Sequence, residues 1–165
     1  MTKKNDFILD VLNVLAWIIF VGLCIDAGFL VYKFIFSLFN PTAAQNQSPH
    51  FRGVMSFAVA ISMLKAYLFY LVVKIFMKLN LVKPFTIEIA KLIEKISYEA
   101  FTIAIVSIIA HQYTKRFIQS DYDVSHLEKY WNDTVAFLMM AAIIFVISQI
   151  FIKGLELQNE NDLTV

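Results

Sequence analysis

Apolar residues fill four long stretches of the chain, each about long enough to cross a bilayer. They run over residues 11–36, 54–77, 96–113 and 131–152, and a transmembrane helix needs about 20 largely apolar residues. The pattern predicts an all-α, polytopic membrane protein whose four transmembrane helices form a compact bundle. We expect residues 1–165 to form a single integral membrane domain, with a tail over 153–165.

Charged and polar residues interrupt the apolar stretches, and a charge in hydrocarbon costs at least about 2.5 kcal/mol on insertion scales. Lys65 lies near the middle of the second stretch, so it needs a partner. We expect its flexible side chain to reach Asp26 in an intramembrane pair that fixes the register of the bundle. Lys74 and Glu99 are candidates for a second pair nearer the cytoplasm. The interruptions, in or at the edges of the stretches, are Asp26, Lys33, Lys65, Glu99, Asp133 and Gln149.

The connection between the second and third stretches predicts a short amphipathic helix. Pro84 can open this helix, because its missing N–H lies where no intrahelical partner exists. Apolar residues then recur at helical spacing, opposite a charged face. The segment either lies at the inner membrane interface or runs straight into the third transmembrane helix. Its apolar residues are Ile89, Leu92, Ile93 and Ile96.

The connection over residues 114–130 is long enough for a second short helix lying on the membrane. Tyr130 and Trp131 close it, and such a pair is typical of an interfacial aromatic anchor. Small residues also recur at four-residue spacing on the second and third stretches, which permits close approach of two helices. Those faces suit the bundle interior or a homo-oligomer, and they are formed by Ala58, Ser62 and Ala66, and by Ala100 and Ala104.

Basic residues near the helix ends indicate the orientation, because cytoplasmic loops retain positive charge. Four crossings put both termini on one side, and that side would carry most of the lysines. We therefore expect both termini to be cytoplasmic. The net charge of +1, without a basic cluster, gives no case for direct nucleic-acid binding.

The residue types that carry chemistry are few and scattered. His50, His111 and His126 fall on or near the outer side and could form a transition-metal or pH-sensing cluster, but their spacing fits no known ligand pattern. Cys24 is the single cysteine, which excludes an internal disulfide and a cysteine-based zinc site. Catalytic motifs are absent, so we predict no enzyme activity, no metal and no cofactor.

The C-terminal tail over residues 155–165 is acidic and would be cytoplasmic. It is either a disordered, solubilising end or a segment that docks in a partner's groove or adds a strand to its sheet. On the second interpretation, the partner-binding candidates in the tail and the middle connection are Pro84, Phe85, Glu156, Glu160, Asp162, Leu163 and Val165.

Two motifs resemble those of a bacterial membrane family catalogued as domain of unknown function 2975. One is Lys83-Pro84-Phe85-Thr86 followed by helically spaced isoleucine and leucine; the other is Gly154-Leu155-Glu156-Leu157-Gln158 continuing through Asn161-Asp162-Leu163-Thr164-Val165. The resemblance implies four spans with both termini inside and no assigned enzyme activity. Members look to be encoded beside a small Cro-like helix-turn-helix regulator. The chain departs from the family's pattern at Glu88, where a capping region with an asparagine-like residue is expected.

The residues and the resemblance together predict a non-catalytic membrane protein that regulates or tethers a small cytoplasmic helix-turn-helix transcription factor. The middle connection and the tail would make this contact, since an acidic surface attracts a basic DNA-binding domain. The alternative is a small transporter, or a ligand or ion sensor, that uses Asp26 and Lys65.

Overall fold

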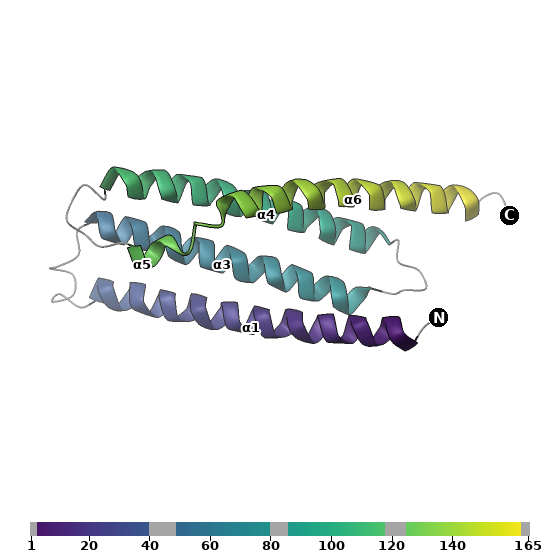
Figure 1. Ribbon diagram of the computed structural model, residues 1–165, viewed down its shortest axis with the longest axis horizontal. Coiled ribbons are helices and arrows are strands. Elements are labelled where there is room, and N and C mark those ends of the chain that lie inside the picture. The colour runs from purple at the N-terminus through teal and green to yellow at the C-terminus, as the bar shows by residue number, and fades with distance from the viewer. Residues whose placement is uncertain (1–2, 40–48, 80–85, 118–124, 163–165) are drawn as a thin grey trace.

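Four long helices account for almost all of the residues that the structure describes. A computed structural model describes residues 3–39, 49–79, 86–117 and 125–162. Within these ranges the chain is all-α, as predicted, with four long helices and one short one (Figure 1). The elements are α1 (Lys3–Phe39), α3 (Pro49–Lys78), α4 (Ile87–Phe117), α5 (Ser125–Glu128) and α6 (Thr134–Asp162).

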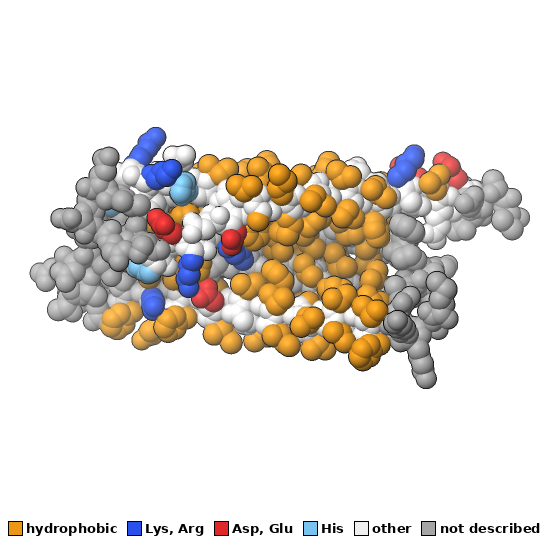
Figure 2. Space-filling model, viewed as in Figure 1, with side chains coloured by type: hydrophobic (Ala, Val, Ile, Leu, Met, Phe, Trp, Pro, Cys, Tyr) orange, Lys and Arg blue, Asp and Glu red, His pale blue; other side chains and the backbone are white. Residues whose placement is uncertain are grey.

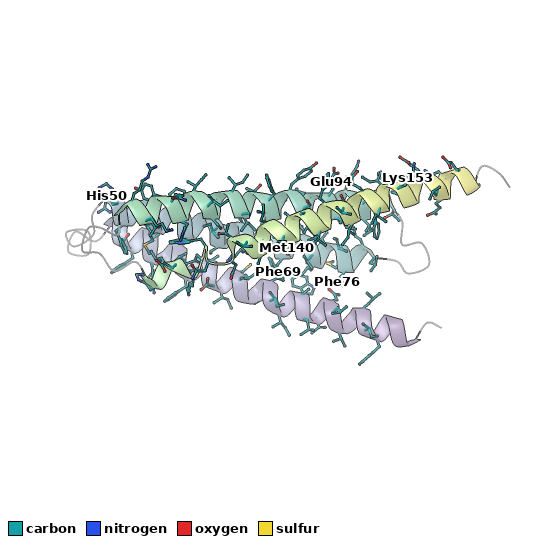
Figure 3. The ribbon with its side chains drawn as sticks, turned by 45° about the horizontal axis from the view of Figure 1, so that its top comes forward. His50, Phe69, Phe76, Glu94, Met140 and Lys153 are labelled. Carbon is teal, nitrogen blue, oxygen red and sulfur yellow. The ribbon has the colours of Figure 1, made fainter. Side chains whose placement is uncertain are left out.

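The long helices lie side by side in the order α1, α3, α4, α6. Helix α4 packs against both α3 and α6, and α3 packs against α1. In the described residues α1 and α6 do not pack extensively against each other, and Figures 1 and 3 show them far apart at the end where the termini lie. The arrangement is thus an open row and not the compact bundle that the hydropathy pattern predicts.

Three of the long helices can cross a membrane by length and composition. Their apolar parts are Phe7–Phe39, His50–Lys78 and Thr134–Glu160, which indicates a multi-pass membrane protein. Helix α4 contains the third predicted span, but it lies outside this set because its apolar run is interrupted by residues such as Glu99 and Gln112. One face of α4 packs inside the row, where Ile103 and Ala104 are fully buried, and its other face is exposed.

The two ends of the molecule differ in what they carry. The ends of α1 and α6 that bear the termini, the end of α3 and the start of α4 all lie at the same end of the molecule, here called the terminal end (Figure 1). At this end Thr86 caps α4, since its hydroxyl oxygen accepts a hydrogen bond from the Ile89 N–H at 3.3 Å. The predicted amphipathic segment therefore runs unbroken into the third long helix, whereas Pro84 lies outside the described residues.

Small residues let α3 and α4 approach each other closely. Ala58, Ser62, Ala100 and Ala104 are all buried, so the two small-residue faces lie inside the helix row as predicted. The tightest approach is at Gly53 of α3, where a Cβ atom would lie 2.6 Å from the Tyr113 hydroxyl oxygen of α4. That position has no room for a side chain unless the tyrosine ring moves.

We predict that Gly53→Ala lowers the stability of the fold by about 1–3 kcal/mol, because overpacking displaces the Tyr113 ring. The matched control is Gly28→Ala in α1, where a Cβ would meet nothing within 4 Å. Thermal unfolding in detergent should show a lower midpoint for the first variant and an unchanged one for the second. Equal midpoints for the two variants would contradict the close α3–α4 contact.

Candidate functional site

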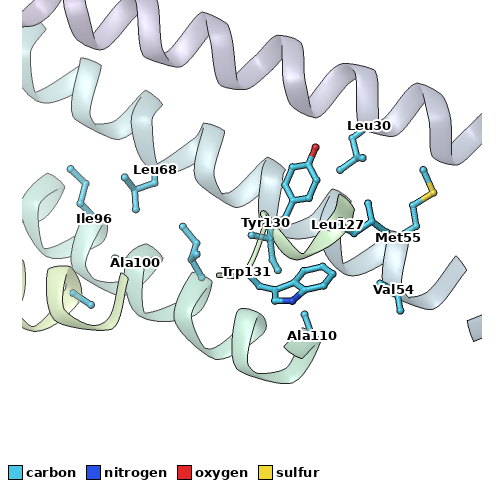
Figure 4. Packing of buried hydrophobic residues seen from close by; sticks show 14 of the residues in the cluster. Leu30, Val54, Met55, Leu68, Ile96, Ala100, Ala110, Leu127, Tyr130 and Trp131 are labelled. Carbon is cyan, nitrogen blue, oxygen red and sulfur yellow. The ribbon is translucent and has the colours of Figure 1, made fainter. Parts of the chain in front are cut away.

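The residues that directly precede α6 pack into the helix row. The segment over residues 125–133, here called the inserted segment, consists of α5 and the turn that follows it. Its Leu127, Tyr130 and Trp131 side chains are only 2%, 8% and 2% exposed, and Figure 4 shows them among side chains of α1, α3 and α4. Tyr130 and Trp131 are therefore core residues here, and the interfacial anchor expected from their sequence is not what the structure shows.

The inserted segment receives the two intramembrane charges that the sequence pairs with each other. The Lys65 ammonium lies 3.5 Å from a carboxylate oxygen of Asp133, and Asp26 accepts a 3.4 Å hydrogen bond from the Tyr130 hydroxyl. The structure thus replaces the expected Asp26–Lys65 contact by two separate contacts. The physical reason is the folding back of residues 125–133, which supplies nearer partners for both charges.

Burial differs strongly between the two members of the Lys65–Asp133 pair. The lysine side chain is 14% exposed and the aspartate side chain is 63% exposed. The lysine nitrogen also lies 5.1 Å from the centre of the Phe137 ring, a cation–π distance. Asp133 thus provides the charge that compensates a largely buried ammonium, while its own side chain stays mostly exposed.

Tyr130 is held in its neutral form by its surroundings. Burial is the largest cause that raises the pKa of Tyr130, followed by the negative charge of Asp26. A protonated phenol donates a hydrogen bond, and Asp26 accepts it.

Figure 2 shows charged side chains gathered on the same side of the apolar belt as α5, away from the terminal end. The polar contacts made by the inserted segment therefore form one site.

The second predicted pair, Lys74 with Glu99, is also replaced by another contact. Lys78 at the end of α3 donates a 2.6 Å hydrogen bond to Glu88 at the start of α4. This hydrogen bond lowers the pKa of Glu88, with a smaller contribution from the charge of Lys74. The pair therefore joins the end of α3 to the start of α4, nearer the terminal end than expected.

The three histidines do not meet at one point. The His126 ring is tilted against the Phe51 ring, with their centres 6.4 Å apart, His50 lies at the start of α3, and His111 lines a cleft beside Trp131. Among the described residues there is no group of three or more histidine, cysteine or acidic side chains that could hold a metal ion.

The C-terminal segment is helical well beyond the predicted span. Helix α6 continues to Asp162, so most of the expected tail is a rigid extension that projects beyond the other helices (Figure 1). Glu156 and Glu160 are exposed there, with Leu157 at 54% exposure between them. A 2.6 Å ion pair joins Lys153 to Glu156. The other partner-binding candidates Pro84, Phe85, Leu163 and Val165 lie outside the described residues, as does the side chain of Asp162.

We predict that substitutions at the two members of the Lys65–Asp133 pair change stability to different extents. Asp133→Asn keeps the shape of the side chain but leaves the lysine without a compensating charge. It should therefore lower the free energy of unfolding by about 1 kcal/mol, a value between those for exposed and buried pairs. Lys65→Met removes the buried charge itself and should be close to neutral.

Thermal unfolding in lipid nanodiscs measures both variants. The double variant should resemble Lys65→Met, because it no longer contains an uncompensated ammonium. If Lys65→Met is as unstable as Asp133→Asn, compensation of the lysine charge is not the role of Asp133.

The sequence comparisons place the described site within a known family. A protein-family model matches residues 39–165 of the chain and is described as "Protein of unknown function (DUF2975)". This match covers α3, α4, α5 and α6, and it leaves out almost all of α1. No curated protein and no solved structure matches the chain.

Proposed function

We propose that this chain, which belongs to the DUF2975 family, is a non-catalytic protein of the bacterial inner membrane that tethers or regulates a small cytoplasmic DNA-binding protein. The observation that carries the proposal is the extension of α6, which presents exposed acids beyond the other helices. The resemblance to a family encoded beside helix-turn-helix regulators supplies the class of partner.

Four crossings with cytoplasmic termini are part of the proposal. Helices α3 and α6 both contain an apolar candidate span, and α3 ends and α4 begins at the terminal end (Figure 1). Helix α4 must then return through the bilayer to reach the inserted segment. The lysines near the terminal end, such as Lys74, Lys78 and Lys153, favour a cytoplasmic location for that end.

The extension of α6 suits a basic partner for two physical reasons. Glu156 and Glu160 stand one helical turn apart, so their charges act on one side of the helix, and Leu157 adds an exposed apolar contact. A segment that is already helical loses less conformational entropy on binding than a disordered tail. Acidic residues in such a helix attract a basic DNA-binding domain and accelerate its association.

We predict that deletion of residues 155–165 leaves membrane insertion intact but abolishes capture of the partner. Affinity purification from detergent-solubilised membranes, followed by mass spectrometry, should recover a small helix-turn-helix protein only with the full-length chain. Capture that is unchanged by the deletion would contradict a role for the tail.

A finer variant tests the electrostatic part of the tail contact. Glu156→Gln with Glu160→Gln should reduce recovery and make it less sensitive to salt, because screening acts on the charges that were removed. Glu128→Gln is the matched control, since it removes an acid from α5, away from the terminal end, without changing α6.

A small transporter or sensor is the second candidate function, favoured by the gathering of polar groups at the inserted segment. Ser62 lies one helical turn from Lys65, and its buried hydroxyl has no hydrogen-bond partner among the described residues. Lys65 and Ser62 could therefore contribute to a polar path beside Asp133.

For a transporter, Lys65→Met should abolish ion flux into liposomes while leaving partner capture unchanged. For a tether, the same variant should change neither measurement. Flux that is absent from the unaltered protein would remove the transporter candidate.

A further inference from the structure

Helix α1 lies at one edge of the helix row (Figure 1), and only the face turned to the row is buried. Ala27, Leu30 and Ser37 form this buried face in the second half of the helix. The opposite face is exposed, and its residues recur at alternating spacings of three and four, which is the pattern of a coiled-coil seam. This face, here called the α1 seam, consists of Gly22, Ile25, Phe29, Tyr32, Phe36 and Phe39.

The charged residues at the inserted segment mark the level at which the lipid core ends. Helix α6 has no charged residue over residues 134–152, a length of about 28 Å, which matches the hydrocarbon thickness of about 30 Å. The exposed Asp133 precedes this run, and Lys153 follows it. Asp133 therefore lies at the surface of the lipid core that is away from the terminal end. Asp26 of α1 lies near the same level, because it accepts the hydrogen bond of the Tyr130 hydroxyl.

The second half of α1 extends past this level. Residues 27–39 continue the helix for about 20 Å beyond Asp26, and Lys33 is their only charged residue. Figure 2 shows hydrophobic side chains that continue along the free edge of α1 past the charged residues. The aromatic rings of the α1 seam are all exposed there, with fractions of 58% for Phe29, 62% for Tyr32, 50% for Phe36 and 81% for Phe39.

Tilting of α1 does not bring this surface into the bilayer. The apolar part of the helix, Phe7–Phe39, has 33 residues and is therefore about 50 Å long. To fit within about 30 Å of hydrocarbon, it would have to tilt by more than about 50°, whereas transmembrane helices tilt by about 0–40°. Part of the α1 seam thus lies outside the lipid, and a contiguous exposed apolar patch of this kind marks an interaction site.

We propose that the α1 seam binds the α1 seam of a second copy of this chain. All copies have the same orientation in the membrane, so a two-fold axis along the membrane normal places two α1 helices in parallel, with like residues at the same level. A heptad seam is complementary to itself in this arrangement. An aromatic side chain buries about 150–250 Å², so the four partly exposed rings of each copy together offer on the order of 1,000 Å², the lower limit for a specific interface.

The groups in and beside the seam suit this contact. The Tyr32 and Phe36 rings stack with their centres 6.1 Å apart, and rings that are already ordered lose less conformational entropy on binding. The Lys33 ammonium lies 4.5 Å from the centre of the Phe29 ring, so its charge has a favourable contact within its own helix. The small-residue faces of α3 and α4 are buried inside the row, which leaves the α1 seam as a separate surface. The inference is independent of partner capture by the extension of α6, because α1 lies at the other edge of the row.

Oxidative cross-linking of the full chain in native membranes tests the position of the contact. Cys24 is the single cysteine and is exposed, but it lies one position away from Ile25 and thus outside the seam. The chain with Cys24→Ala and Ile25→Cys should form a disulfide-linked dimer, whereas the unaltered chain, with its thiol at almost the same depth on another face of α1, should not. Tyr32→Cys with Cys24→Ala should also cross-link, in the part of the seam outside the lipid. Equal cross-linking of the unaltered chain and the Ile25→Cys chain, or none at either seam position, would overturn the proposal.

Charged variants separate a second copy from another partner. Energy transfer between labelled chains in liposomes, measured as lipid is added, should show that Tyr32→Glu weakens self-association at least about tenfold, because two like charges then face each other across the axis. Leu38→Glu, which charges an exposed residue outside the seam, should leave self-association unchanged.

Opposite charges should restore the contact. Chains with Tyr32→Glu and Tyr32→Lys, each labelled differently and mixed, should pair with each other, which misfolded chains could not do. The proposal is overturned if the unaltered chain is monomeric, if the Tyr32→Glu and Leu38→Glu chains associate equally well, or if the oppositely charged chains do not pair. It is also overturned if the purified chain carries a different protein that Tyr32→Glu releases, since that protein would then occupy the seam.

Discussion

Lipid tails are as apolar as leucine side chains, so burial of apolar surface inside a bilayer gives little drive for one helix to pack on another. Contacts in such a protein depend on close backbone approach and on polar groups that hydrocarbon cannot satisfy. Helices α3 and α4 follow this rule, because Ala58 and Ala100 have no exposed surface and Gly53 leaves no room beside Tyr113. Helix α1 packs against α3 alone among the long helices, and only 6% of its apolar window is buried. The open row is therefore the expected result of this constraint.

The same constraint explains why the inserted segment occupies the helix row. The Lys65 ammonium and the Asp26 carboxylate would each be costly beside lipid, and the inserted segment gives both of them a polar partner. It also fills the space next to them with the Leu127 and Trp131 side chains. One short stretch of chain thus satisfies two charges on two helices that are already neighbours.

The sequence predicts helix positions and burial better than it predicts partners. Periodicity located the long helices, and the small-residue spacing identified the buried faces of α3 and α4. The need of Lys65 for a partner was also predictable, but its choice of Asp133 was not, because hydropathy indicates depth and not which elements are neighbours. Asp133 was visible as a charge at the edge of the fourth stretch. Tyr130 and Trp131 were misassigned because aromatic residues with a polar atom suit both an interface and a satisfied core.

The inserted segment also determines where α6 begins, and therefore how far this helix extends along its own axis. The helix has 29 residues, which corresponds to a length of about 44 Å, whereas the hydrocarbon core is about 30 Å thick. Part of α6 must therefore extend beyond the core. Its start is fixed by the Lys65–Asp133 contact and by the Thr134 hydroxyl, which donates a 2.6 Å hydrogen bond to the Trp131 carbonyl. The helix begins beside buried residues of the row, so the surplus length appears at the terminal end, where Glu156 and Glu160 are exposed. A rearrangement at the inserted segment would then move the acidic extension, because a continuous helix transmits an axial displacement along its whole length.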